Sequence, residues 1–240
     1  MITFLRKFTL SVFLVFLSAL QFPLSSETRE EYRSLPDKGS IASLISIHDT
    51  FISTFWEKHH PILEKAYPTL QFIRPEELHI TLMAIGPWEW DHLDTLKKYA
   101  LVYPKEINSP LVIYFMGKNK EWLTLELEKV PQEWAKRVMH NKKHLVALSL
   151  TKAATFDHEF RPHISLVKAT SSQSINLLSE VESYLREHFP KENVQLSENE
   201  LKMRTVFWLA SPERPSTYAN YIPLDEWLEI YRPLYERASE

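Results

Sequence analysis

Short apolar runs and longer stretches with helical periodicity alternate along the chain. Runs rich in β-branched and apolar residues predict strands, and apolar residues that recur every three or four positions predict helices. This mixture lacks the regular alternation of a doubly wound sheet, so it favours an α+β fold. The predicted strands are 40–47, 79–85, 111–116, 122–127, 145–150, 164–167 and 205–210. The predicted helices are 51–67 (interrupted at Pro61), 91–102, 131–140, 172–189 and a short C-terminal one near Trp227.

The first 26 residues follow a different pattern. Arg6 and Lys7 precede an apolar run over 8–20, which is the layout of a secretory signal peptide. We therefore expect residues 1–26 to be removed and the protein to be secreted or periplasmic. The alternative is an uncleaved anchor, in which case residues 1–24 are the membrane-bound part.

The charged segment 27–38 predicts a linker, followed by one domain over 39–240. The leader contains two basic residues and no acidic one, so its removal makes the net charge of −3 more negative. A net acidic protein is not expected to bind long duplex DNA, whereas a small nucleotide or an RNA end needs only a local cluster of positive charge. The absence of cysteine excludes disulfides, zinc–thiolate sites and thiol nucleophiles.

Two segments of the chain carry nearly the same motif. His-Ile-Thr-Leu occupies 79–82, His-Ile-Ser-Leu occupies 163–166, and Arg-Pro precedes each. In a strand, residues i and i+2 point to the same face. Each motif therefore presents one imidazole and one hydroxyl together, and two adjacent strands of this kind would bring both pairs to one place.

Such a set suits phosphodiester cleavage. One neutral histidine removes a proton from the attacking oxygen, and the other, protonated, donates a proton to the leaving oxygen. The hydroxyls can donate hydrogen bonds to the non-bridging oxygens, where negative charge develops. The sequence does not assign the base and acid roles between His79 and His163.

The two motifs resemble those of the 2H phosphoesterase superfamily, which includes the 2′,3′-cyclic phosphodiesterases once called 2′–5′ RNA ligases. The similarity includes Gly86, seven residues after the first histidine, and covers about residues 40–225. It implies two pseudo-symmetric lobes, each an antiparallel sheet with outer helices, around a central cleft. It further implies that catalysis needs no metal or cofactor. The residues it assigns are the catalytic His79 and His163 and the phosphate ligands Thr81, Ser165 and Lys168, the last at a position where members often carry arginine.

Other candidate residues follow from position. Trp88 and Trp90 come just after the first motif and could stack a nucleobase, although packing over a strand end is an equal alternative. For Arg161 we favour a structural or solvated role. His140 and His144 have a spacing that can chelate a metal on a helix, but the lysines between them disfavour a cation.

We therefore expect a metal-independent, monomeric phosphodiesterase that hydrolyses a 2′,3′-cyclic phosphate or an oligonucleotide phosphodiester. One alternative is a catalytically silent nucleotide-binding or scaffold protein of the same fold. Another is a cytoplasmic RNA-processing enzyme whose N-terminus only resembles a leader.

Overall fold

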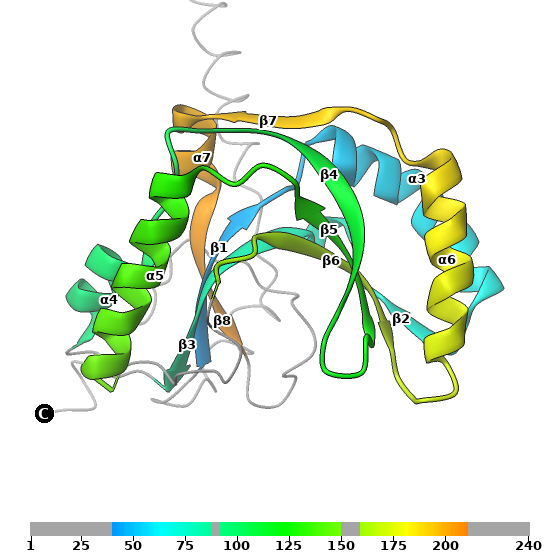
Figure 1. Cartoon of the computed structure of the whole chain (residues 1–240), viewed down its shortest axis with the longest axis horizontal. Helices are drawn as coiled ribbons and strands as arrows, with labels where there is room; N and C mark the ends of the chain where they lie inside the picture. The colour runs from blue at the N-terminus through cyan, green and yellow to red at the C-terminus, as the bar shows by residue number, and fades with distance from the viewer. Residues whose placement is uncertain (1–39, 88–91, 150–158, 211–240) are drawn as a thin grey trace, which may run out of the picture. The chain divides into compact units, whose positions relative to one another are not determined.

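The structure is a computed structural model that describes residues 40–87, 92–149 and 159–210 (Figure 1). Its strands are β1 (Ser40–Ser46), β2 (Leu70–Phe72), β3 (His79–Pro87), β4 (Glu106–Met116), β5 (Trp122–Leu127), β6 (His163–Ala169), β7 (Asn193–Ser197) and β8 (Thr205–Ala210). Its helices are α3 (Phe51–Ala66), α4 (Leu93–Ala100), α5 (Gln132–Ala147), α6 (Ile175–His188) and α7 (Glu198–Arg204), with a 3₁₀ turn η1 (Pro75–Glu77).

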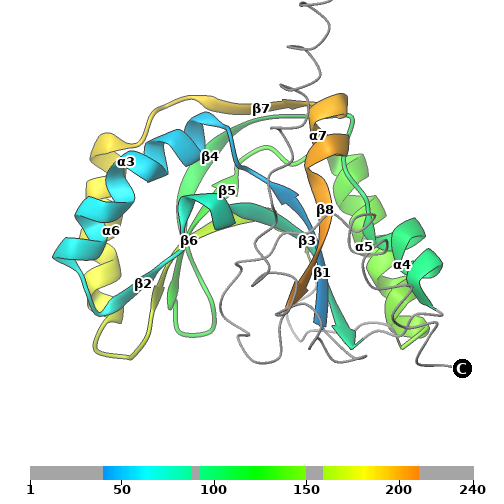
Figure 2. The same cartoon turned by 180° about the vertical axis from the view of Figure 1, so that it is seen from behind.

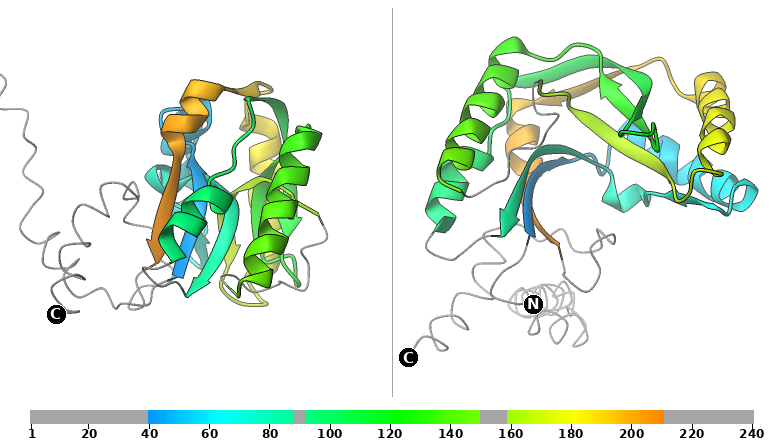
Figure 3. Two further views of the ribbon diagram at one scale, coloured as in Figure 1. Left: turned by 90° about the vertical axis from the view of Figure 1, so that its left-hand side faces the viewer. Right: turned by 60° about the horizontal axis from the view of Figure 1, so that its bottom comes forward.

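The described strands form one sheet in the order β7-β4-β5-β6-β3-β1-β8, and β2 pairs with the far end of β6. Every pairing among them is antiparallel. The sheet curls, as Figure 3 shows. Helices α3 and α6 lie beside one half of it and α4 and α5 beside the other (Figures 1 and 2). The predicted α+β class is confirmed, and the two halves join in a single sheet at β3 and β6.

Most of the predicted elements are confirmed. The β4–β5 hairpin pairs Leu111 with Leu127 and Met116 with Trp122, and Gly117 in its turn has φ 92°. Helix α6 buries Leu178, Val181 and Leu185 and contacts β4, β5 and β6. Helix α3 continues through Pro61, so the expected interruption was wrong. Its buried stripe of Ile52, Trp56, His59 and Leu63 extends on both sides of the proline and offsets the lost backbone hydrogen bond.

One predicted strand, 145–150, was also wrong. Helix α5 runs to Ala147, and Leu145 belongs to the same buried stripe as Trp134 and Val138. Within the described part of this run, Leu145 is fully buried, whereas 147–149 are exposed and Leu148 keeps 47% of its surface exposed. Helical packing of one side chain in this run therefore outweighs its local strand propensity.

Strands β2 and β7 and helix α7 were not predicted. The leader, the linker, Trp88, Trp90 and the C-terminal helix lie outside the described residues. Within 40–87, 92–149 and 159–210, no helix combines the length and the apolar character needed to cross a membrane.

Candidate active site

The two motifs meet at the centre of the sheet. Strand β3 pairs with β6 through Ile80 and Ile164, and both isoleucines are fully buried. Extending this antiparallel register by one residue each way places His79 opposite Ser165. It likewise places Thr81 opposite His163. Because side chains alternate along a strand, all four polar side chains lie on the face opposite the isoleucines, and all four are partly exposed.

Each motif ends in a β-bulge at its leucine. The pairing of β3 with β1 leaves Leu82 as an extra residue, and the pairing of β6 with β5 leaves Leu166 as its counterpart. Leu82 and Leu166 are buried together with the residues that follow them, Met83 and Val167. A bulge shifts the alternation by one residue. Lys168, five residues after its histidine, therefore returns to the histidine's face, whereas a regular strand would turn it away.

Backbone carbonyls hold both imidazoles in the same way. His79 Nδ1 lies 2.7 Å from the Glu77 carbonyl oxygen, and His163 Nδ1 lies 2.9 Å from the Arg161 carbonyl oxygen. A carbonyl only accepts hydrogen bonds, so each Nδ1 donates its proton and each neutral ring carries its lone pair on Nε2. Both histidines thus present the nitrogen that can take or give a proton.

Burial, with a smaller contribution from the nearby His163, lowers the pKa of His79 to about 4, while the hydrogen bond to the Glu77 carbonyl opposes the shift. His79 is therefore neutral at ordinary pH. A neutral imidazole beside a second histidine is the state that a general base requires.

Among the residues that the structure describes, neither Thr81 nor Ser165 uses its hydroxyl in a hydrogen bond to the protein. Both hydroxyls can therefore donate to a ligand. Lys168 stands opposite Trp122 in the register, with Nζ 4.9 Å from the centre of the indole ring. The structure thus places all five residues predicted for catalysis and phosphate binding on one face of β3 and β6.

Solved structures share this architecture. E. coli LigT in apo form aligns with a TM-score of 0.50 and 14% identity, over 78% of this chain and 95% of LigT. E. coli LigT complexed with 3′-AMP aligns with a TM-score of 0.46 and 12% identity, over 72% of this chain and 88% of LigT. A Thermus thermophilus protein aligns with a TM-score of 0.42 and 12% identity, over 71% of this chain and 83% of that protein. No family model matches the chain, and no curated protein matches it significantly.

The chain has the fold of the LigT-like 2H phosphoesterases. At 14% identity the likeness to LigT establishes the fold alone. The resemblance drawn from the two motifs is confirmed at that level. The roles of the motif residues stay predictions.

Sequence reasoning missed three side chains of this LigT-like sheet that lie beside the second motif. Tyr114, Trp122 and Glu126 belong to the β4–β5 hairpin. For Trp122 and Glu126 the signal was the alternation in 122–127, which puts both on one face. The register then places Glu126 directly opposite His163.

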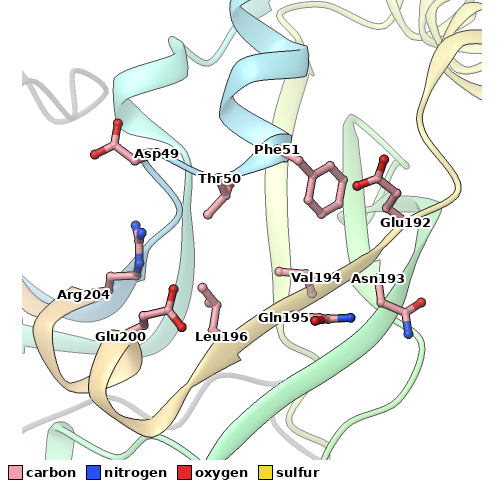
Figure 4. Close-up of a pocket in the computed structure, with 10 residues that line it drawn as sticks. All are labelled: Asp49, Thr50, Phe51, Glu192, Asn193, Val194, Gln195, Leu196, Glu200 and Arg204. Atoms are coloured by element: carbon pink, nitrogen blue, oxygen red, sulfur yellow. The ribbon is translucent and has the colours of Figure 1, made fainter.

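Other features of the LigT-like fold lie apart from the motifs. The ring of His144 packs against that of Tyr99 in a tilted arrangement, with 4.3 Å between ring centres, and His140 is exposed. Nowhere in the described ranges do three histidine or acidic side chains gather as they would around a metal. A hollow of about 430 Å³ between the β1–α3 turn and the β7–α7 segment contains no motif residue (Figure 4).

Proposed function

We propose that this chain is a phosphodiesterase of the 2H type that works without a metal, with His79 as general base and His163 as general acid. The substrate is a 2′,3′-cyclic phosphate or an oligonucleotide phosphodiester, presented as a small nucleotide or an RNA end. The observation that carries this proposal is the pairing of Ile80 with Ile164, which puts both imidazole–hydroxyl pairs on one face of the sheet.

The proposed reaction uses His79 as a proton acceptor and His163 as a proton donor. His79 Nε2 accepts a proton from water as the water oxygen bonds to phosphorus. The bond from phosphorus to one ribose oxygen breaks, and His163 donates its proton to that oxygen. The products are a phosphomonoester and a free ribose hydroxyl, so atoms and charge balance. Water attack and departure must be roughly in line, which requires the two imidazoles to stand on opposite sides of the phosphate.

The phosphate has three candidate ligands on the same face. Thr81 and Ser165 each offer one hydroxyl donor, and Lys168 offers a positive charge. Donors aimed at non-bridging oxygens stabilise the transition state more than the ground state, because negative charge grows on those oxygens during attack. The bulge in β6 supports this role for Lys168, since it returns the lysine to the same face of the sheet as His163 and Ser165.

The experiment that tests the proposal is a product-mapped substrate screen. Protein lacking residues 1–26 is incubated with 2′,3′-cyclic nucleotides, 2′–5′ oligoadenylate and RNA with a cyclic end, in the presence of EDTA. We expect one of these substrates to give a phosphomonoester. We also expect kcat/KM to rise with pH through about 4, because His79 must lose its proton to act as base. Nucleotide binding without turnover of any substrate would favour the silent nucleotide-binding alternative.

A further inference from the structure

Beside the second motif, three side chains form a cluster that the proposed chemistry does not use. Arg161 Nη2 donates a hydrogen bond to Glu126 Oε2 at 2.7 Å. The same guanidinium lies over the ring of Tyr114, 4.5 Å from its centre. Tyr114 keeps 41% of its surface exposed, and the Arg161 side chain keeps 42%. The cluster therefore presents a flat cationic and aromatic surface to solvent.

Glu126 has an unsatisfied oxygen. The residue is only 7% exposed, and its Oε1 has no hydrogen-bond partner among the residues that the structure describes. A buried carboxylate oxygen without a donor costs free energy, so such atoms in native proteins usually meet a ligand or an ordered water. A carboxylate only accepts hydrogen bonds. The missing partner is therefore a donor, an N–H or an O–H group.

The register places this cluster next to the phosphate-binding face. Tyr114 pairs with Thr124, which in turn pairs with Ser165. Adjacent strands lie about 4.8 Å apart, so Tyr114 is about 10 Å across the sheet from Ser165. The intervening Thr124 has a short side chain, and its hydroxyl donates to the Tyr114 carbonyl rather than to a ligand. Thr124 itself is fully buried, so a nucleotide whose phosphate lies at Ser165 extends its base above this position, toward the exposed Tyr114–Arg161 surface.

We propose that Tyr114, Arg161 and Glu126 form the subsite for the nucleobase of the substrate, and that they select bases with an exocyclic amino group. This inference rests on the proposed function. The base stacks on the Tyr114–Arg161 surface. Its amino group donates a hydrogen bond to Glu126 Oε1. A base without that donor leaves the carboxylate oxygen unpaired, and a site built around a buried polar group discriminates strongly against such a ligand.

The first test compares two ligands that differ only in the amino group. The substrates are adenosine 2′,3′-cyclic phosphate and the same compound with unsubstituted purine as its base. We expect kcat/KM to favour adenine by at least about tenfold, as one lost hydrogen bond to a charged group implies. Equal kcat/KM values for the two substrates would overturn the inference, because Glu126 Oε1 would then meet a water or a ribose hydroxyl.

Variants assign the preference to the cluster. In Glu126→Gln, Arg161 holds the amide oxygen, so the amide NH₂ faces the ligand. The adenine preference should then fall to about one or reverse. Glu128→Gln, the same chemical change at an exposed position two residues away, is the matched control and should keep the preference. Retention of the preference in Glu126→Gln contradicts the assignment.

Stacking is tested separately at Tyr114. Glycerol 1,2-cyclic phosphate carries no base and serves as the reference substrate. Tyr114→Ala should lower the ratio of kcat/KM for the adenine substrate to that for the glycerol substrate by roughly tenfold, whereas Tyr114→Phe should retain it. An unchanged ratio in Tyr114→Ala counts against the stacking surface. This ratio is independent of whether Glu126→Gln folds.

Binding separates failure of the inference from failure of the proposed function. Calorimetry with adenosine 3′-phosphate and purine riboside 3′-phosphate measures the same amino-group preference without any turnover. Preferential adenosine binding with no hydrolysis contradicts the proposed function and supports the subsite. Hydrolysis with no preference in either assay supports the proposed function and overturns the subsite.

Discussion

The lowered pKa of His79 makes a prediction about folding that does not depend on any substrate. The folded chain holds this imidazole neutral because burial disfavours its charged form. In the unfolded chain the same group titrates at its ordinary value of 6.5. Between these two values the unfolded state binds a proton that the folded state does not. Protonation therefore favours unfolding as the pH falls below 6.5, and the effect is absent above it.

The magnitude follows from the two pKa values of His79, 6.5 unfolded and about 4 folded. One pKa unit corresponds to about 1.4 kcal/mol. Integrating the proton uptake of the unfolded state shows that the free energy of unfolding falls by about 2 kcal/mol at pH 5 and by about 3 kcal/mol at pH 4. Replacing His79 with glutamine removes the titrating group, so the variant should escape this loss.

Urea denaturation measures this difference. The free energy of unfolding is determined at pH 7.5 and at pH 5 for the wild type, for His79→Gln and for His140→Gln, in which an exposed imidazole is lost. From pH 7.5 to pH 5, the free energy of unfolding should fall by about 2 kcal/mol more in the wild type than in His79→Gln. Comparing the two proteins cancels the contributions of the other described histidines with a lowered pKa, His59 and His60. Equal losses in both proteins would refute the argument that His79 is held neutral by burial.

Three further predictions concern the proposed phosphate ligands and the hairpin turn. Thr81→Ala and Ser165→Ala should each lower kcat by roughly tenfold to a thousandfold, because each removes a hydrogen-bond donor to the charge that develops on the phosphate. Thr81→Ser keeps the donor and should retain most of kcat. Steady-state kinetics on the best substrate measures both effects. Lys168→Ala should raise KM and Lys168→Arg should largely keep it, because the charge persists; equal effects of the two substitutions contradict an electrostatic role. Gly117→Ala should lower the free energy of unfolding by about 1 to 2 kcal/mol, because φ is 92°. The added Cβ would also displace the Glu121 carboxylate, which accepts a hydrogen bond from the Asn119 N–H. An unchanged melting temperature contradicts this.

The faces of the two motif strands could be predicted from the sequence. Alternation alone put Ile80 and Ile164 in the core and the histidines on the other face, and the burial of both isoleucines confirms it. The β4–β5 hairpin was equally clear, because the turn residues around Gly117 separate two apolar runs. These predictions succeed because they depend on local periodicity.

The meeting of the two motifs depends on contacts that local sequence does not encode. The pairing of Ile80 with Ile164 joins strands 84 residues apart in the chain, and strand order depends on tertiary packing. The bulge at Leu166 also leaves no local signal. Without this bulge, the spacing of five residues between His163 and Lys168 would put the lysine on the face of the sheet opposite the histidine.

Two missed elements did have local signals. Strand β7 alternates strictly between exposed and buried residues. Helix α7 begins with a capping box formed by Ser197 and Glu200. The wrong strand at 145–150 shows the opposite error, because a short apolar run was given more weight than the helical stripe that continues from Trp134 to Leu145.

The central claim is that His79 and His163 act together on one phosphate. Phosphorus NMR of a 2′,3′-cyclic nucleotide incubated with excess EDTA tests this claim most directly. The wild type should convert the cyclic phosphate to a single phosphomonoester. His79→Ala and His163→Ala, each shown by circular dichroism to be folded, should each be slower by about a hundredfold or more. Conversion at the wild-type rate by either variant, or loss of wild-type conversion in EDTA, would contradict the account.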